Sequence, residues 1–465
     1  MGIVGLRSCW ISCWIMIYVL LLIIFFWLFP NDLYPMIERK VYGSIIVVYV
    51  IIGGGLIYAV LNKSVYVFEP IVLISLMYLA IFVFMPIHDI LNHYTTQYGK
   101  YIMNGGVRAN IIVAISYIAF FICYYFKQEV YRLKKKKQRI DSWYLKKKVV
   151  RIALVIWLIS FILYIYYTVS NRGLSLDYIF SLGFYGMQDD TLTASSPLAF
   201  LNKFGNSLAI PYLYICVFSK SKFLKLVVLL LTLIVYFING SRYVMIIFLA
   251  GPIIYRYIKR KQSPKILYTI VLLVFLLFSC AFIASMRHGM RAGEGSSAYD
   301  SFTTNDIFDP FYSNFTLYKT FYGVVETFPD KHQYQLGRGM ILGTLILFIP
   351  RALWPEKPRE AICDYIEWSI NKRAQISGLA YNNIGEYYVE FGVLGCVFFM
   401  GLLGYGCRKM KRLYASPNKT VNTLILYSVL LPCLFAIINA GWTPMNFYTI
   451  LFCIFPWFIL KRFLN

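Results

Sequence analysis

Residues 10–29 read WISCWIMIYVLLLIIFFWLF, an apolar stretch of twenty residues that contains no charged side chain. A helix of about 20 apolar residues is long enough to cross the hydrocarbon core of a bilayer. The stretch is long for the apolar region of a signal peptide, and it lacks a cleavage site with small residues. We therefore expect a transmembrane helix that is retained as an anchor.

Stretches of this kind recur along the chain, and they set the fold class. Of the 465 residues, 59% are apolar and only 14% are charged, whereas soluble domains have about 45–50% and about 25%. This composition excludes an ordinary soluble enzyme and a disordered protein. It predicts an all-α polytopic membrane protein in which residues 1–465 form one membrane domain of about 12 transmembrane helices. The helices are expected near residues 9–29, 43–61, 67–86, 108–126, 151–169, 201–219, 223–239, 243–257, 266–286, 383–406, 421–438 and 446–460.

The positions of the basic residues explain the formal net charge of +24. Twelve helices place both termini on the same side. With that side inside the cell, the inner loops hold 28 of the 45 basic residues and three of the 21 acidic ones. Such an excess is typical of cytoplasmic loops, so we expect both termini in the cytoplasm. The lysines at 134–137 fit a topology determinant beside anionic lipid. A nucleic-acid partner is not expected, because no aromatic and basic binding module surrounds them.

The largest loop on the predicted outer (periplasmic) side covers residues 287–382. A pure channel or carrier does not need such a loop. Within it, residues 339–350 are apolar but too short to span a membrane, which predicts an interfacial or re-entrant segment. The sequence PRALWPEKP (350–358) follows and would place Arg351 and Lys357 beside lipid phosphates. The alternative interpretation is a plain interfacial anchor.

Arg242 is the only charged residue between Lys225 and Arg256. It follows Asn239-Gly240-Ser241 at the turn between two predicted helices of about 15 residues, each roughly 22 Å long. Because the hydrocarbon core is about 30 Å thick, we expect the turn to be recessed and Arg242 to lie at membrane depth. Ionisable residues at that depth are functional candidates. The alternative is a side chain that extends outward to water.

Two glutamates mark the start of the tenth predicted helix, in the sequence YNNIGEYYVEFGVLG (381–395). Glu386 and Glu390 are four residues apart and share one helical face, and Glu390 is expected to lie deeper in the membrane. That face would abut the large loop. The alternative is a solvated helix start at which carboxylates complement the helix dipole.

The charged residues of the predicted outer side suit a phosphate or pyrophosphate ligand. Arginine binds such groups through a planar fork and needs no metal for it. The inner loops contain only Glu69, Glu129 and Asp141 as acids, which argues against a Mg²⁺-dependent transferase of nucleotide sugars there. No zinc-binding spacing is present, so neither a metal nor a cofactor is expected. An outer-face enzyme would draw its donor from a lipid-linked sugar.

Three segments in a fixed order, within a twelve-helix plan with a late outer loop, carry a resemblance to a known family. They are Asn239 to Arg242, IPRALWPEKP (349–358), and NNIGEYY (382–388) followed by FGVLG (391–395). The chain resembles the bacterial O-antigen polymerases, also called oligosaccharide repeat-unit polymerases. Some members carry an arginine, ten residues and a glycine in an outer loop, a spacing that Arg172 and Gly183 share.

The resemblance implies a metal-independent glycosyltransferase of the bacterial inner membrane. A growing glycan would leave undecaprenyl pyrophosphate and join a hydroxyl of the next lipid-linked repeat unit, which builds O-antigen or a related surface polysaccharide. Fixed arginines would stabilise the leaving pyrophosphate, and a general base would assist the hydroxyl. A chain-length regulator and a flippase would be partners. The residues expected to bind substrate are Arg172, Arg242, Arg287, Arg291, Arg351 and Lys357, and those expected to act as the base are His332, Glu386 and Glu390.

Two other functions stay open at this point. A flippase for lipid-linked oligosaccharides fits twelve helices equally well, although carriers tend to contain inverted repeats and none is visible. An O-antigen ligase shares the donor and differs in its acceptor, the lipid A core. Related ligases have a histidine before the late helix, where this chain has Asn382 and Asn383, so a histidine-based mechanism is not expected at that position.

Overall fold

The computed structural model describes residues 2–30, 34–61, 67–97, 100–126, 143–172, 199–239, 242–260, 312, 315–347, 349, 353–354, 356, 381–416, 419–439 and 441–463. In these residues the regular structure is helical apart from two short antiparallel strands, β1 (Thr96–Gln97) and β2 (Lys100–Tyr101). Seven of these helical segments are long and apolar enough to cross a membrane, which confirms the all-helical membrane class. They cover Met36–Leu61, Pro70–Leu91, Met103–Tyr125, Lys146–Tyr167, Asn383–Ala415, Val421–Asn439 and Thr443–Phe463.

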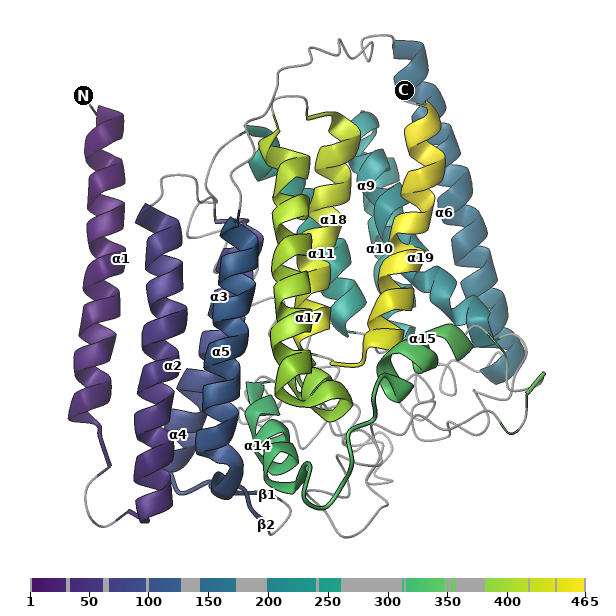
Figure 1. Cartoon of the computed structure of the whole chain (residues 1–465). Coiled ribbons are helices and arrows are strands. Elements are labelled where there is room, and N and C mark those ends of the chain that lie inside the picture. The colour runs from purple at the N-terminus through teal and green to yellow at the C-terminus, as the bar shows by residue number, and fades with distance from the viewer. Residues whose placement is uncertain are drawn as a thin grey trace, which may run out of the picture.

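The N-terminal helices stand side by side at one edge of the bundle (Figure 1). Tyrosines join the first two, because Tyr42 and Tyr49 donate hydrogen bonds to the backbone oxygens of Phe25 (3.1 Å) and Tyr18 (2.9 Å). The third predicted helix, 67–86, extends further than expected, to Leu91. The elements are α1 (Gly2–Trp27), α2 (Met36–Leu61), α3 (Pro70–Leu79), the π-helical η1 (Ala80–Phe84), α4 (Met85–Leu91), the 3₁₀-helical η2 (Met103–Gly105) and α5 (Gly106–Tyr125).

The remaining long helices form the other half of the bundle, and their contacts give their directions. The hydroxyl of Ser207 donates to the backbone oxygen of Phe452, and further along both segments Tyr214 and Trp457 each donate to Asn422, so α9 and α19 run parallel. Only two or three residues separate α9 from α10, α10 from α11 and α18 from α19, so each of these consecutive pairs is antiparallel. α11 therefore runs antiparallel to α18. The elements are α6 (Trp143–Arg172), the 3₁₀-helical η3 (Ala199–Leu208), α9 (Ala209–Phe218), α10 (Lys222–Asn239), α11 (Arg242–Arg260), α17 (Asn383–Ala415), α18 (Val421–Asn439), α19 (Thr443–Leu460) and the 3₁₀-helical η6 (Lys461–Phe463).

Short helices cap one end of the bundle, which we call the α14 end (Figure 1). They are α14 (Leu317–Thr327), the π-helical η5 (Arg338–Leu342) and α15 (Gly343–Ile346). α1 begins and α19 ends at the opposite end. η5 and α15 cover much of the expected segment 339–350. The predicted helix 266–286 and most of the large loop 287–382 lie outside the described residues.

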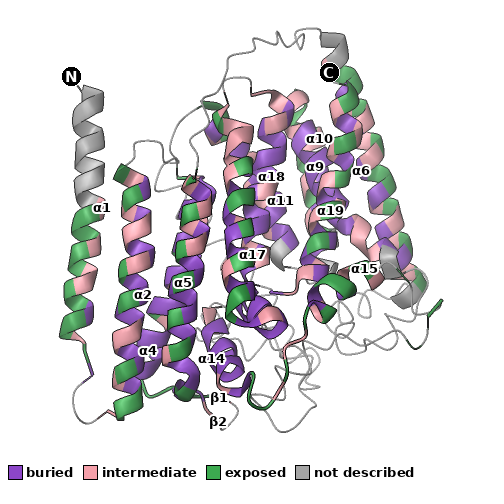
Figure 2. Ribbon diagram, in the orientation of Figure 1, coloured by how far each residue is buried: buried purple, intermediate pink, exposed green. Residues whose placement is uncertain are grey.

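Burial separates the inner surfaces of the helices from their outer surfaces (Figure 2). The largest fully buried side chains are almost all tyrosines, among them Tyr78, Tyr117 and Tyr427. Apolar side chains such as Ile23 and Val47 are exposed, as expected where a helix faces lipid rather than water.

A buried ion pair joins three segments at the end opposite α14. Glu69 is fully buried, and its carboxylate accepts hydrogen bonds from Lys411 (3.0 Å), Tyr124 (3.1 Å) and Tyr414 (2.6 Å). A buried charge is stable only when it is paired and hydrogen-bonded in this way. Glu69 therefore fastens the start of α3 to α5 and to the last turns of α17.

Candidate functional site

α17 is built from two helices rather than one. At Gly392, φ is 63° and ψ is −152°, a combination that is essentially restricted to glycine. The chain reverses there, because the amide of Asn383 lies 3.4 Å from the sulfur of Met400, and Cys396 Sγ lies 3.5 Å from the backbone oxygen of Ile384. In a straight helix, Asn383 and Met400 would be about 25 Å apart. Residues 383–391, the short arm, therefore fold back along the beginning of residues 393–415, the long arm.

This reversal inverts the expected order of the two glutamates. The short arm begins beside Met400 and ends at the turn, so Glu390 lies nearer the α14 end than Glu386 does. The expectation that Glu390 lies deeper is wrong, because it assumed a helix that continues through Gly392. The sequence NNIGEYY consequently lies inside the bundle, and all of its residues up to Tyr388 are buried.

Two asparagines fix the start of the short arm. The side-chain oxygen of Asn382 accepts a hydrogen bond of 2.7 Å from the backbone N–H three residues later, which caps the helix. The side-chain oxygen of Asn383 accepts one of 3.0 Å from Tyr78. A β-carbon at Gly441 would lie only 2.3 Å from the backbone oxygen of Asn382, so glycine is needed for this close approach. The segment that precedes α19 is thus pressed against the start of the short arm.

Glu386 connects the short arm to α19. One carboxylate oxygen accepts from the backbone N–H of Thr443 (2.8 Å), and the other accepts from the hydroxyl of the same residue (2.6 Å). Thr443 is the first residue of α19, where backbone N–H groups have no acceptor within the helix. With 1% of its surface exposed, Glu386 holds two helix starts together.

Glu390 connects the short arm to η5 in the same way. Its two oxygens accept hydrogen bonds from the backbone N–H groups of Gly337 (2.7 Å) and Met340 (3.0 Å), and its own backbone oxygen accepts from Leu336 (2.8 Å). Glu390 is fully buried. Both glutamates therefore complement helix starts, but the helices belong to segments remote in sequence rather than to the glutamates' own helix.

α11 begins close to the starts of the short arm and of α19. A β-carbon at Gly251 would lie 3.7 Å from the backbone oxygen of Ser428, so these two residues are at the same level. Because α11 and α18 are antiparallel, stepping back from Gly251 to Arg242 corresponds to stepping forward along α18 to its last turn, near Asn439. The starts of α11, α19 and the short arm therefore meet around the end of α18, at a level that we call the recessed junction.

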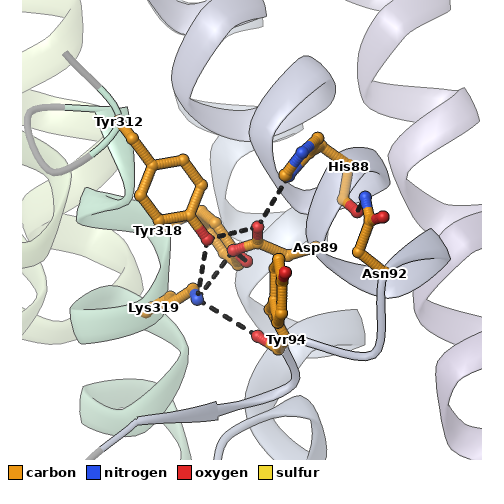
Figure 3. A network of polar contacts seen from close by, with 7 residues as sticks. All are labelled: His88, Asp89, Asn92, Tyr94, Tyr312, Tyr318 and Lys319. Carbon is orange, nitrogen blue, oxygen red and sulfur yellow. Dashed lines mark hydrogen bonds and ion pairs between the residues drawn. The ribbon is translucent and has the colours of Figure 1, made fainter. Parts of the chain in front are cut away.

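A cluster of titratable side chains surrounds Asp89 at the α14 end (Figure 3). The carboxylate of Asp89 is fully buried and lies 2.7 Å from Lys319 Nζ. It also accepts hydrogen bonds of 2.5 Å from both Tyr312 and Tyr318. Burial, together with the nearby carboxylate, raises the pKa of both tyrosine hydroxyls well above the usual value, so they remain donors. The cluster fastens α4 to α14.

The Asp89 cluster was not predicted from the sequence. Asp89 and Lys319 lie far apart in the chain, and no local pattern pairs them. A signal was nevertheless present, because Asp89 directly follows His88 near the end of an apolar stretch of membrane-spanning length. Ionisable residues in such a stretch are functional candidates.

The other predicted site residues are distributed as follows. His332 is half-buried just beyond α14, with its ring 5.4 Å from that of Phe328. Arg172 is the last residue of α6, and Arg242 is the first residue of α11. Lying outside the described residues are Arg287, Arg291, Arg351 and Lys357. The structure thus brings Glu386, Glu390 and the start of α11 into one region, and His332 lies near the same end.

Comparison with known proteins identifies the family to which the chain belongs. Among the described residues, no group of three or more His, Cys, Asp or Glu side chains could hold a metal ion. No curated protein and no solved structure matches the chain significantly. A family model described as O-antigen polysaccharide polymerase Wzy matches residues 13–465, nearly the whole chain. The chain therefore belongs to the O-antigen polysaccharide polymerase Wzy family, whose members polymerise lipid-linked repeat units.

Proposed function

We propose that the polysaccharide is extended at the α14 end of the bundle and that this end faces the outside of the bacterial inner membrane. The proposed donor is a growing glycan on undecaprenyl pyrophosphate, and the acceptor is a hydroxyl group of the next lipid-linked repeat unit. The anomeric carbon of the donor forms a bond to the acceptor oxygen while its bond to pyrophosphate breaks. A flippase would supply the substrate, and a chain-length regulator would be a partner.

The observation that supports this placement most strongly is the recessed junction. Three helices begin there, at Arg242, Asn383 and Thr443. Helix starts present backbone N–H groups that attract phosphate. The starts at Asn383 and Thr443 hold Asn382 and Glu386 as acceptors. The start of α11 carries Arg242, whose cation adds to the backbone donors, and it is the proposed binding site for the pyrophosphate.

Further positive charge is proposed to come from the loop residues and from the end of α6. Fixed cations stabilise the charge that develops on a leaving pyrophosphate, and this requires no metal ion. The exposed apolar side chains of Ile341, Leu342 and Leu345 suit a helix that lies in the membrane interface. Such a helix would deliver residues 349–358 to the level of lipid phosphates. The additional cations are Arg172, Arg287, Arg291, Arg351 and Lys357.

A general base is needed to take the proton of the acceptor hydroxyl. Glu386, Glu390 and His332 are the residues proposed from sequence. The oxygens of both glutamates already hold backbone or hydroxyl donors, which favours a positioning role for them. Proton transfer is therefore better assigned to a histidine than to either glutamate.

The test is a gel of surface polysaccharide from a strain that lacks the gene, with and without the gene restored. We expect a ladder of chain lengths to collapse to a single repeat unit and to return on complementation. Lipid-linked units trapped on the inner leaflet would instead indicate a flippase. Loss of even the single repeat unit from the lipid A core would indicate a flippase, a ligase or an earlier step, and either result would overturn the proposal.

A further inference from the structure

His88 is the accessible member of the Asp89 cluster. Half of its side-chain surface is exposed, whereas that of Asp89 is fully buried. The Nδ1 atom of His88 lies 3.0 Å from the carboxylate oxygen Oδ1 of Asp89. In Figure 3 the imidazole approaches the carboxylate from one side, and Tyr312, Tyr318 and Lys319 approach it from the other.

The surroundings of Asp89 fix the tautomer of this histidine. Tyr312 and Tyr318 donate hydrogen bonds to the carboxylate, and Lys319 forms an ion pair with it, so both of its oxygens act as acceptors. A carboxylate acceptor places the proton of the neighbouring imidazole on Nδ1 and leaves the lone pair on Nε2. An imidazole oriented by a buried carboxylate is the arrangement that enzymes use for general-base catalysis.

We propose that His88, oriented by Asp89, is the general base of the glycosyl transfer. The inference rests on the proposed function, because it requires an acceptor hydroxyl at the α14 end. Nε2 of His88 takes the proton of that hydroxyl as its oxygen bonds to the anomeric carbon of the donor. The bond from that carbon to pyrophosphate breaks, and its electron pair leaves with undecaprenyl pyrophosphate. The imidazolium then returns its proton to water.

Direct contacts connect this dyad to the recessed junction. The side-chain amide of Asn382 lies 3.5 Å from the backbone oxygen of Leu317. The next residue, Tyr318, donates its hydroxyl hydrogen to Asp89. α14 therefore contacts the start of the short arm through Leu317 and the Asp89 carboxylate through Tyr318. The aromatic rings of Tyr312 and Tyr94 lie 5.8 Å and 6.2 Å from the imidazole, and such rings suit contacts with a sugar.

The experiment uses the full-length protein in liposomes, supplied with the lipid-linked repeat unit extracted from a strain that lacks the gene. Because His88 is half exposed, His88→Ala should leave the unfolding temperature unchanged. We expect its turnover to fall at least about 100-fold, with little change in KM. Added imidazole should restore turnover to His88→Ala. It should not restore turnover to Asp89→Asn, because that variant keeps the imidazole of His88. Rescue of this kind would not follow from a loss of packing alone.

Two control variants separate the outcomes. His93→Asn, which changes another exposed histidine at the end of α4, should retain wild-type turnover, and asparagine tolerates the positive φ of 59° at that position. The turnover of His332→Ala should fall by less than tenfold. If wild-type protein forms polymer and His88→Ala forms it at the same rate, or imidazole fails to rescue it, the dyad proposal is wrong. If the wild-type protein forms no polymer, the proposed function itself fails.

Discussion

The side-chain amide of Asn383 lies 3.4 Å from the sulfur of Met400, although the two residues are 17 positions apart along α17. This contact exists only because the chain reverses at Gly392. The reversal carries the sequence NNIGEYY into the bundle, where it meets the starts of α19 and α11. Half-helices whose starts lie inside a membrane bundle are a recurrent way to build binding sites for anions.

The reversal makes Gly392 sensitive to substitution. Gly392→Ala is expected to lower stability by about 1–3 kcal/mol from backbone strain alone, and the new methyl group would lie 2.9 Å from the ring of Tyr334. Gly406→Ala is the matched control on the long arm, since nothing lies within 4 Å of its β-carbon. The unfolding temperature in detergent should drop for the first variant and stay level or rise for the second. Equal unfolding temperatures would contradict the reversal.

Glu386 is expected to be a positioning residue rather than the base. Glu386→Ala removes the acceptor of two donors of Thr443, and each such hydrogen bond contributes about 0.5–1.5 kcal/mol. Glu386→Gln keeps one oxygen for the backbone N–H, so it should retain most of the stability and most of the turnover. A Gln variant that folds normally but forms no polymer would identify Glu386 as a proton acceptor instead.

Arg242 is expected to determine turnover without determining folding. Arg242→Ala should abolish long-chain polymer at an unchanged protein level, because the pyrophosphate loses its cation. Arg242→Lys should restore part of the chain length, since lysine keeps the charge but loses the planar fork. The distribution of chain lengths on a gel gives the readout, and a normal distribution in Arg242→Ala would rule out the assigned site.

Lys319 is expected to stabilise the α14 end through its buried pair with Asp89. Lys319→Met leaves a buried carboxylate without its cation, which costs about 3–5 kcal/mol. Lys100→Met offers a comparison, because Lys100 and Glu326 form a more exposed pair at 3.4 Å, and such pairs contribute about 0–1 kcal/mol. A thermal shift in detergent should be large for the first and small for the second. Similar shifts would show that the Asp89 pair is not a stabilising contact.

The membrane class and most helix positions could be predicted from the sequence, because a bilayer imposes a length on apolar stretches that composition reveals directly. The sequence could place Arg242 at membrane depth. It could not show that the start of α11 lies beside the NNIGEYY segment. The break at Gly392 could not be predicted, since a glycine in an apolar stretch is compatible with a continuous helix. Its positive φ becomes necessary only when the short arm packs against Met400 and Tyr334.

The Asp89 cluster illustrates a second limit. Tyr318, which donates a hydrogen bond to Asp89, lies 229 residues away in the sequence, so this pair forms only when α14 docks on α4. The roles of the glutamates were equally hidden, because three of their four donors are backbone N–H groups of remote helix starts. Every residue except proline has a backbone N–H group, so the sequence does not reveal which of them donates a hydrogen bond.

Reconstitution of the purified protein alone in liposomes, with the extracted lipid-linked repeat unit, tests the proposed polymerase activity directly. We expect polymer of several repeat units on undecaprenyl pyrophosphate, formed without added nucleotide sugar and without another protein. Transfer of single units across the membrane without any new glycosidic bond would contradict it.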